Sequence, residues 1–203
     1  MENVKTMEKS VVDFSKKSEI IQTILIWILA LVVPTFLGSL IKEVFGAQSV
    51  IAQNAQIIVG TTVNTLLILS ALNLKGFGKI AAVVTAPSVS TILSGFVFKS
   101  ASPLMAWMIP AIWVGNFALI YAYKLIKLAK NKNYFLAGVI GVAVKVAIIF
   151  GFFNILRAFG VFPDKMVNTL ATAMGTTQLI TATLGVMISS VIYAFEKRSA
   201  KAE

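Results

Sequence analysis

Tyr134 to Leu156 reads YFLAGVIGVAVKVAIIFGFFNIL, an almost unbroken apolar run with one charge, Lys145, near its centre. About 20 apolar residues are enough for a helix to cross the hydrocarbon core of a bilayer, so this run predicts a transmembrane helix. A charged side chain at that depth costs roughly 2.5–3.5 kcal/mol on insertion scales, and it therefore normally faces a bundle interior or a ligand. The run thus predicts both the fold class and a first candidate site residue.

The composition of the whole chain agrees with this interpretation. Of its 203 residues, 58% are hydrophobic and only 13% are charged, which is typical of an integral membrane protein and not of a soluble domain. The length suits one compact bundle with short loops. The formal net charge of +10 comes from lysines that lie mostly in the termini and between apolar runs. It therefore indicates a cytoplasmic face, and we expect no nucleic-acid partner.

Six apolar runs are long enough to cross a lipid bilayer, and they predict an all-α integral membrane protein, a single bundle of six transmembrane helices. The first run is too long for a signal peptide, and too many residues of mixed charge precede it. We expect a cytoplasmic N-terminal segment at 1–19, the transmembrane domain at 20–195 and a cytoplasmic tail at 196–203. The expected spans are Ile20–Ile41, Val50–Leu74, Phe77–Phe98, Pro103–Tyr123, Tyr134–Leu156 and Met166–Phe195.

The distribution of basic residues predicts the orientation. With six spans, both termini share one side of the membrane with the second and fourth connections, and this side holds thirteen of the 18 lysines and arginines. The positive-inside rule therefore places both termini in the cytoplasm of a multi-pass protein of the cell membrane. The thirteen are Lys5, Lys9, Lys16, Lys17, Lys75, Lys79, Lys124, Lys127, Lys130, Lys132, Lys197, Arg198 and Lys201. The other side holds Lys42, Lys99, Arg157 and Lys165.

Several classes of chemistry lack the residues that they need. The chain has no cysteine and no histidine, which excludes disulfides, thiolate chemistry, Ser-His triads and the usual zinc or haem ligands. We therefore expect neither an enzyme nor a bound cofactor. No GxxxxGK[ST] motif is present, so active transport would draw its energy from a partner or from an ion gradient. All eight acidic residues fall outside the expected spans, which leaves Lys145 without a carboxylate at its own depth.

The second expected span carries a stripe of polar residues. Gln53, Gln56, Gly60 and Asn64 are spaced by three, four and four, which places them on one helical face from the outer surface to mid-membrane. Lipid does not tolerate three amides on such a stripe, so the face must point into the protein. Amides in membrane helices also bind neighbouring helices together. Both readings, interhelical contacts and the wall of a hydrated pocket, stay open.

Further polar residues lie at the depth of Lys145. Asn64, Asn116 and Gln178 all fall near the middle of their spans, on three other helices. Three amides around one ammonium suit a carboxylate, a phosphate or a polar carbonyl group. Lys145 lies about 16 Å along its helix from the nearer end, too far for its stem to reach water by snorkelling. Trp113 adds a ring for a planar ligand, although membrane aromatics more often serve packing.

Short motifs on five of the spans support a resemblance. They are Val63-Asn64-Thr65-Leu66-Leu67, Thr85-Ala86-Pro87 with Ser94-Gly95, Met108-Ile109-Pro110 with Val114-Gly115-Asn116, Lys145, and Gln178-Leu179-Ile180-Thr181-Ala182. With these motifs, the chain from about residue 50 to its C-terminus resembles the substrate-binding S components of energy-coupling factor (ECF) transporters, in particular a group with no settled substrate.

The resemblance implies six helices, cytoplasmic termini and capture of a vitamin-like molecule in an outward-opening pocket. It also implies a partner module, a transmembrane subunit with two ATPases, which topples the S component to release substrate. In this family, the first helix often docks on that module through small residues. The matching stripe here is Ala30, Pro34 and Gly38, in which Pro34 departs from the usual alanine.

Two other functions compete with uptake driven by a separate ATPase. The first is a stand-alone small secondary transporter or channel, but ion coupling usually uses intramembrane Asp, Glu or His, and the halves of the chain show no inverted repeat. The second is an intramembrane enzyme, for which no nucleophile–base pair or metal cluster is present. The sequence thus favours a substrate-binding subunit.

Overall fold

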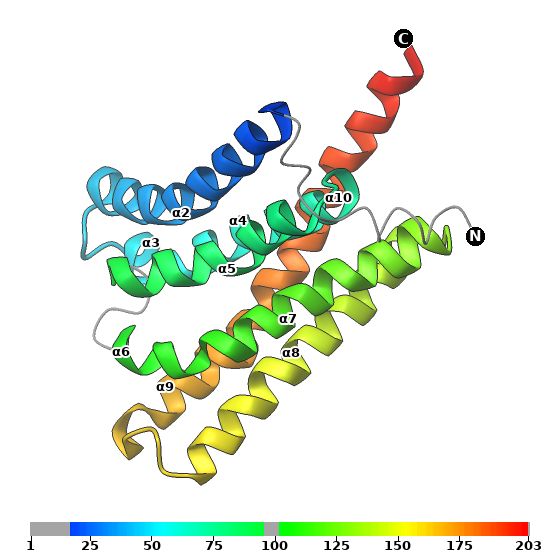
Figure 1. The fold of residues 1–203 in the computed structure, drawn as a ribbon. Coiled ribbons are helices and arrows are strands. Elements are labelled where there is room, and N and C mark those ends of the chain that lie inside the picture. The colour runs from blue at the N-terminus through cyan, green and yellow to red at the C-terminus, as the bar shows by residue number, and fades with distance from the viewer. Residues whose placement is uncertain (1–16, 96–101, 203) are drawn as a thin grey trace.

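The computed structural model describes residues 17–95 and 102–202. In these residues the chain forms helices joined by short connections, with no strand, and six of the helices are long and apolar enough to cross a membrane (Figure 1). The membrane protein with six spans that the sequence predicts is confirmed at this level. The spans are built on α2 (Lys17–Phe45), α4 (Ala55–Asn73), α5 (Phe77–Ser94), α7 (Ile109–Ala122), α8 (Tyr134–Ala158) and α10 (Thr176–Ala202).

The helices pack in preferred pairs. α10 packs most extensively against α4, α7 against α8, and α2 against α5. Figure 1 shows α2 at the edge of the bundle, beside α4 and α5. Most of α2 is therefore open to the surroundings, and large apolar side chains such as Leu29 and Phe36 are exposed. Lipid is the environment that suits such a face.

The second span is not one continuous helix. A short helix, α3 (Val50–Gln53), ends at Asn54, and α4 begins at Ala55. The break lies at Asn54. Its side-chain Nδ2 donates to the Val50 carbonyl at 2.8 Å, and its backbone N–H also donates to carbonyls of α3. Asparagine side chains compete with helical backbone bonds in this way. The prediction of one helix over Val50–Leu74 is wrong at this point.

The third span runs through Pro87 and ends at Ser94. Gly95 follows in the left-handed region, with φ +66°, a conformation that glycine adopts without a steric penalty and that ends many helices. The expected end of this span, at Phe98, lies outside the described residues.

The fourth and sixth spans are composite. The fourth begins with α6 (Ser102–Met105) and a 3₁₀ turn (Ala106–Met108), continues in α7 and ends in a π-helical segment, Tyr123–Ala129. The sixth begins with the amphipathic α9 (Asp164–Met174), breaks at Gly175 and continues as α10 to Ala202. The predicted cytoplasmic tail therefore begins inside α10, and the predicted N-terminal segment lies almost wholly outside the described residues.

The bundle has two distinct ends. α3, α6 and α9 gather at one end, while the start of α2 and the end of α10 lie toward the other (Figure 1). The connection from α4 to α5 and the end of the π-helical segment share this second end, because successive spans alternate in direction. The lysines of both connections, Lys75 and Lys130 among them, therefore gather there.

Candidate ligand-binding site

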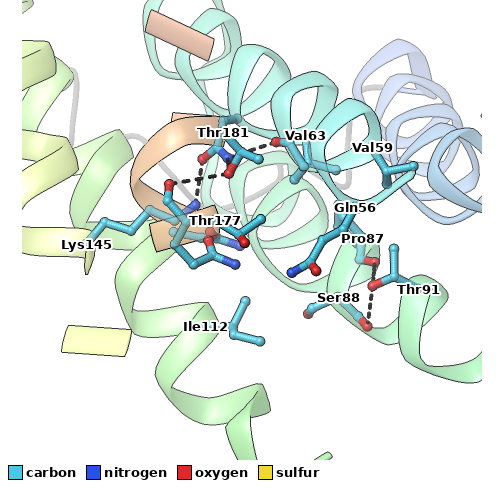
Figure 2. A pocket seen from close by; sticks show the side chains of 14 residues that line it. Gln56, Val59, Val63, Pro87, Ser88, Thr91, Ile112, Lys145, Thr177 and Thr181 are labelled. Carbon is cyan, nitrogen blue, oxygen red and sulfur yellow. Dashed lines mark hydrogen bonds between the residues drawn. The ribbon is translucent and has the colours of Figure 1, made fainter. Parts of the chain in front are cut away.

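A small cavity lies within the bundle, in the half nearer α3, α6 and α9. It is lined by the first part of α4, the last part of α5, the middle of α7, Lys145 of α8 and the first part of α10. Its volume is about 70 Å³. Figure 2 shows Lys145 and Gln56 entering this cavity from different helices. Five helices that are far apart in sequence thus contribute polar side chains to one place.

Lys145 lies at the inner end of the cavity. Its side chain is only 2% exposed, and its Nζ donates a hydrogen bond of 2.6 Å to Asn64 Oδ1. Asn64 is itself fixed, because its Nδ2 donates to the Gly60 carbonyl at 2.8 Å and to Thr181 Oγ1 at 3.3 Å. These two bonds turn Oδ1 toward the lysine. Lys145 is therefore held in the bundle interior and does not snorkel.

The ammonium of Lys145 meets an amide and no carboxylate. None of the residues that line the cavity is acidic. The acidic residues in the described part of the chain are Glu19, Glu43, Asp164 and Glu196, and none of them belongs to the lining. An amide oxygen accepts a hydrogen bond but does not neutralise a charge. Among the described lining residues, Lys145 therefore has an amide partner and no carboxylate.

Asn116 lines the cavity from α7 and is 3% exposed. Its Nδ2 donates to the Val84 carbonyl of α5 at 3.1 Å. Pro87 has no N–H, so the Val83 carbonyl four residues earlier loses its helical donor. The Asn116 bond goes to the next carbonyl along the helix, that of Val84. This contact binds α7 to α5 and leaves the Asn116 side-chain oxygen for other partners.

Gln56 and Gln178 supply the remaining amides. Gln56 Nε2 is buried and has no hydrogen-bond partner in the described structure. A buried donor without a partner costs about 1–3 kcal/mol. A group that enters the cavity could accept a hydrogen bond from Gln56 and remove this cost. Gln178 is half-buried on α10, also lines the cavity, and its backbone carbonyl accepts from Thr181 Oγ1 at 3.3 Å. Both residues therefore border the cavity.

Two of the predicted site residues do not line the cavity. Gln53 is exposed at the end of α3, and its Nε2 donates to the Gln48 carbonyl at 3.1 Å. The break at Asn54 interrupts the helix that carried it in the predicted stripe. Trp113 is half-buried, and its Nε1 donates to Ser88 Oγ at 2.9 Å. Because Ser88 lines the cavity, Trp113 supports the wall from behind and does not stack over the opening.

The predicted docking stripe faces the chain's own helices. Ala30, Pro34 and Gly38 are all buried, on the face of α2 that packs against the bundle, mainly against α5. The hydroxyls of Thr35 and Ser90 join the two helices within this interface. In this structure the stripe is therefore not a free surface, because α2 uses its small residues to approach its own neighbours. Docking of a partner through it stays a prediction that requires α2 to move.

Hydroxyl groups complete the lining, and the sequence did not single them out as site residues. Ser88 and Thr91 come from α5, and Thr177 and Thr181 from α10. Thr181 lies in a stripe of small and polar residues, which more often indicates helix packing in membranes. Ser88 follows Pro87 directly. This position beside a helix-breaking residue is the feature of the sequence that could have marked Ser88 as a lining residue.

Comparisons with known proteins add no support for a family. No family model matches this chain, and no curated protein and no solved structure matches it either. The resemblance noted in the sequence therefore rests on the residues alone.

The arrangement suits a ligand that accepts hydrogen bonds from the protein. Lys145 and Gln56 offer N–H groups, while the described residues hold no cluster of His, Cys, Asp or Glu fit for a metal ion. The cavity is small beside the 300–1,000 Å³ that is typical of pockets for drug-sized ligands. As it stands it admits a group of about the size of a carboxylate together with few waters. A vitamin-sized ligand requires the walls to move apart.

Proposed function

We propose that the chain is the membrane-embedded, substrate-binding subunit of an ATP-driven uptake transporter of the ECF type. It lies in the plasma membrane with both termini in the cytoplasm and captures a small vitamin-like or anionic metabolite from outside. A partner transmembrane subunit and two ATPases supply the energy for release. The resemblance of the motifs in five spans is the basis for naming this class.

One observation carries the proposal. Lys145 is almost fully buried about 16 Å along its helix, and among the described residues it bonds to an uncharged amide. It lines a cavity together with the unpartnered amide nitrogen of Gln56. Ionisable residues at membrane depth are expensive and normally serve a substrate or ion pathway. A lysine beside a cavity whose described lining holds no carboxylate suits the capture of an anionic group.

The polarity of the bundle supports the direction of transport. The cavity lies in the half of the bundle nearer α3, α6 and α9, while the connections rich in lysine lie at the opposite end. The positive-inside rule makes that opposite end cytoplasmic. The cavity is then nearer the outside, where an uptake protein must meet its substrate.

A stand-alone secondary transporter or channel is the alternative, and the lining of the cavity disfavours it. Coupling to protons or sodium normally uses an intramembrane carboxylate or histidine, and none lines this cavity. Energy from a separate ATPase fits such a lining better.

The test compares bound ligand in the purified protein and in two variants. Native mass spectrometry of gently purified wild-type protein should show a co-purifying small molecule, and Lys145→Ala should reduce its occupancy by at least about tenfold because the anion loses its counter-charge. Lys79→Ala is the matched control. Lys79 is also a buried lysine, but it donates to Gln22 Oε1 at 2.9 Å and does not line the cavity.

Equal occupancy in wild type and Lys145→Ala, with both folded, would show that the cavity is not the substrate site. A second measurement separates the two transport classes. Wild-type uptake should survive collapse of the ion gradients and should be lost when co-purifying ATPase subunits are inactivated. The opposite pattern would make the chain a secondary transporter.

A further inference from the structure

A second cavity lies at the other end of the bundle from Lys145. It is lined by the end of α4, the connection at 74–76, the start of α5, and α7 with its π-helical segment, and its volume is about 390 Å³. It is therefore several times larger than the cavity beside Lys145. No residue of the proposed substrate site lines it, so it calls for its own explanation.

The cavity carries two basic side chains. Lys75 and Lys124 both line it, and none of its described lining residues is acidic. Lys124 is half-buried, and its Nζ donates to the Leu74 carbonyl at 3.1 Å. An ammonium has three N–H groups, so this bond fixes the lysine in place and leaves two donors for a ligand. Lys75 is exposed at the rim of the same cavity. The pair suits a phosphate.

The walls of the cavity are apolar and face outward. Phe117 and Tyr121 of α7 are 45% and 41% exposed, and their rings stack with centroids 6.2 Å apart. Phe77 and Leu128, on the other walls, are also largely exposed. On a membrane-spanning helix such side chains contact lipid tails. The cavity thus joins a cationic rim to an apolar surface, which a free phosphate ion would leave uncovered.

The backbone at this place is also unusual. Lys124 is the second residue of the π-helical segment Tyr123–Ala129, within which the hydrogen bonds span one residue more than in an α-helix. Segments of this kind are rare and occur frequently at functional sites. The segment ends where Lys130 N–H bonds to the Leu125 carbonyl at 3.0 Å. The wider π-helical turn thus lies at Lys124, which lines the cavity.

We propose that this cavity binds one anionic phospholipid, with the headgroup phosphate between Lys75 and Lys124 and the acyl chains along Phe117 and Tyr121. Basic pockets at helix ends on the cytoplasmic side are suited to anionic headgroups, and each lysine near the surface contributes about fivefold in affinity. The bound lipid joins α4, α5 and α7 at the end of the bundle opposite the substrate cavity. This site is independent of the transport proposal.

The test is native mass spectrometry of the purified protein in detergent, with added phosphatidylglycerol or phosphatidylcholine of the same acyl chains. Phosphatidylglycerol should bind as a single tight adduct and phosphatidylcholine only weakly. The double variant Lys75→Gln, Lys124→Gln should weaken the phosphatidylglycerol adduct about 30-fold. Lys130→Gln with Lys132→Gln is the matched control, because it removes the same charge from two exposed lysines that do not line the cavity and should leave the adduct in place.

Lys75→Gln alone guards against a folding defect, because Lys75 is exposed and no hydrogen bond of its side chain needs to be broken. It should weaken the adduct about fivefold. Equal weakening of the adduct by both double variants would mean that only the net charge of the protein matters, and it would overturn the proposed site. Equal binding of the two lipids would overturn it as well. Displacement of the lipid by inorganic phosphate would show a site for free phosphate instead.

Discussion

At the scale of single residues, the proposal for the small cavity depends on the Lys145–Asn64 pair. A hydrogen bond to a charged group contributes about 1.5–3 kcal/mol, while a lysine at membrane depth costs roughly 2.5–3.5 kcal/mol on insertion scales. The bond of 2.6 Å therefore offsets about half of this cost or more, with an acceptor that carries no charge of its own. The lysine is held in place without a carboxylate among the described lining residues, as the proposed capture of an anion requires. A carboxylate in place of the Asn64 amide would instead offset the cost by neutralising the charge of Lys145.

Asn64→Asp tests this argument directly. The new carboxylate should form an ion pair with Lys145. The occupancy of an anionic ligand should then fall about tenfold or more while the bundle stays folded. The change also removes the donor that bonds to Gly60 and Thr181, so we expect little net gain in the midpoint of thermal unfolding. Ligand occupancy by native mass spectrometry and a thermal melt in detergent are the two measurements. Wild-type occupancy in a folded Asn64→Asp protein would mean that the charge of Lys145 does not serve the ligand.

Most of the candidate residues could be predicted because burial in lipid is costly for polar groups. Asn64, Asn116, Gln178 and Gln56 follow from that cost and from helical spacing, and the structure brings all four to the cavity with Lys145. Gln53 does not follow, because its place depends on a side-chain bond of the next residue, Asn54. Spacing along an ideal helix contains no information about such a local competitor.

At the scale of elements, close helix packing holds the site together. α4 and α10 approach through two glycines: a Cβ at Gly185 would lie 2.7 Å from Asn64 Cβ, and one at Gly60 would lie 3.0 Å from Thr181 Cγ2. Small residues allow such approaches between membrane helices. The same helices carry Asn64 and Thr181, which are bonded to each other. The packing of this pair therefore fixes the acceptor of Lys145.

Gly185→Ala should disturb this interface. The added methyl would also come within 3.0 Å of the Thr65 backbone nitrogen, which cannot rotate away, so α10 must shift. We expect a loss of about 1–3 kcal/mol in stability, together with weaker ligand binding. Gly151→Ala is the matched control on α8, because nothing lies within 4 Å of a Cβ there. Thermal unfolding of both variants is the measurement, and equal midpoints would show that the α4–α10 approach has room to spare.

The ends and breaks of the helices were harder to predict than their existence. Hydropathy gave α8 to within two residues of its end, because its apolar run has clear polar limits. Hydropathy did not predict the breaks at Asn54 and Gly175, since each lies inside a run long enough to be read as one span. Breaks of this kind arise from side-chain bonds and from contacts between helices, and an average over a window of sequence removes both.

At the scale of the whole molecule, the two cavities lie toward opposite ends of one bundle, and this gives the proposals a common direction. The proposed substrate cavity lies in the half nearer α3, α6 and α9, and the proposed lipid cavity lies where the lysine-rich connections gather. If those connections face the cytoplasm, the lipid is a cytoplasmic-leaflet lipid and the substrate comes from outside. A reversed bundle would exchange both assignments together.

The absence of native cysteine makes this orientation directly measurable, since a single introduced thiol is then the only one to label. Lys132→Cys places it in the connection before α8, and Phe159→Cys places it at the other end of the same helix, where the native side chain is 80% exposed. A maleimide that cannot cross membranes should label Phe159→Cys in intact cells, and Lys132→Cys only after the membrane is opened, because the positive-inside rule makes the lysine-rich end cytoplasmic. The reverse pattern would turn the substrate cavity toward the cytoplasm, and uptake from outside would lose its structural basis.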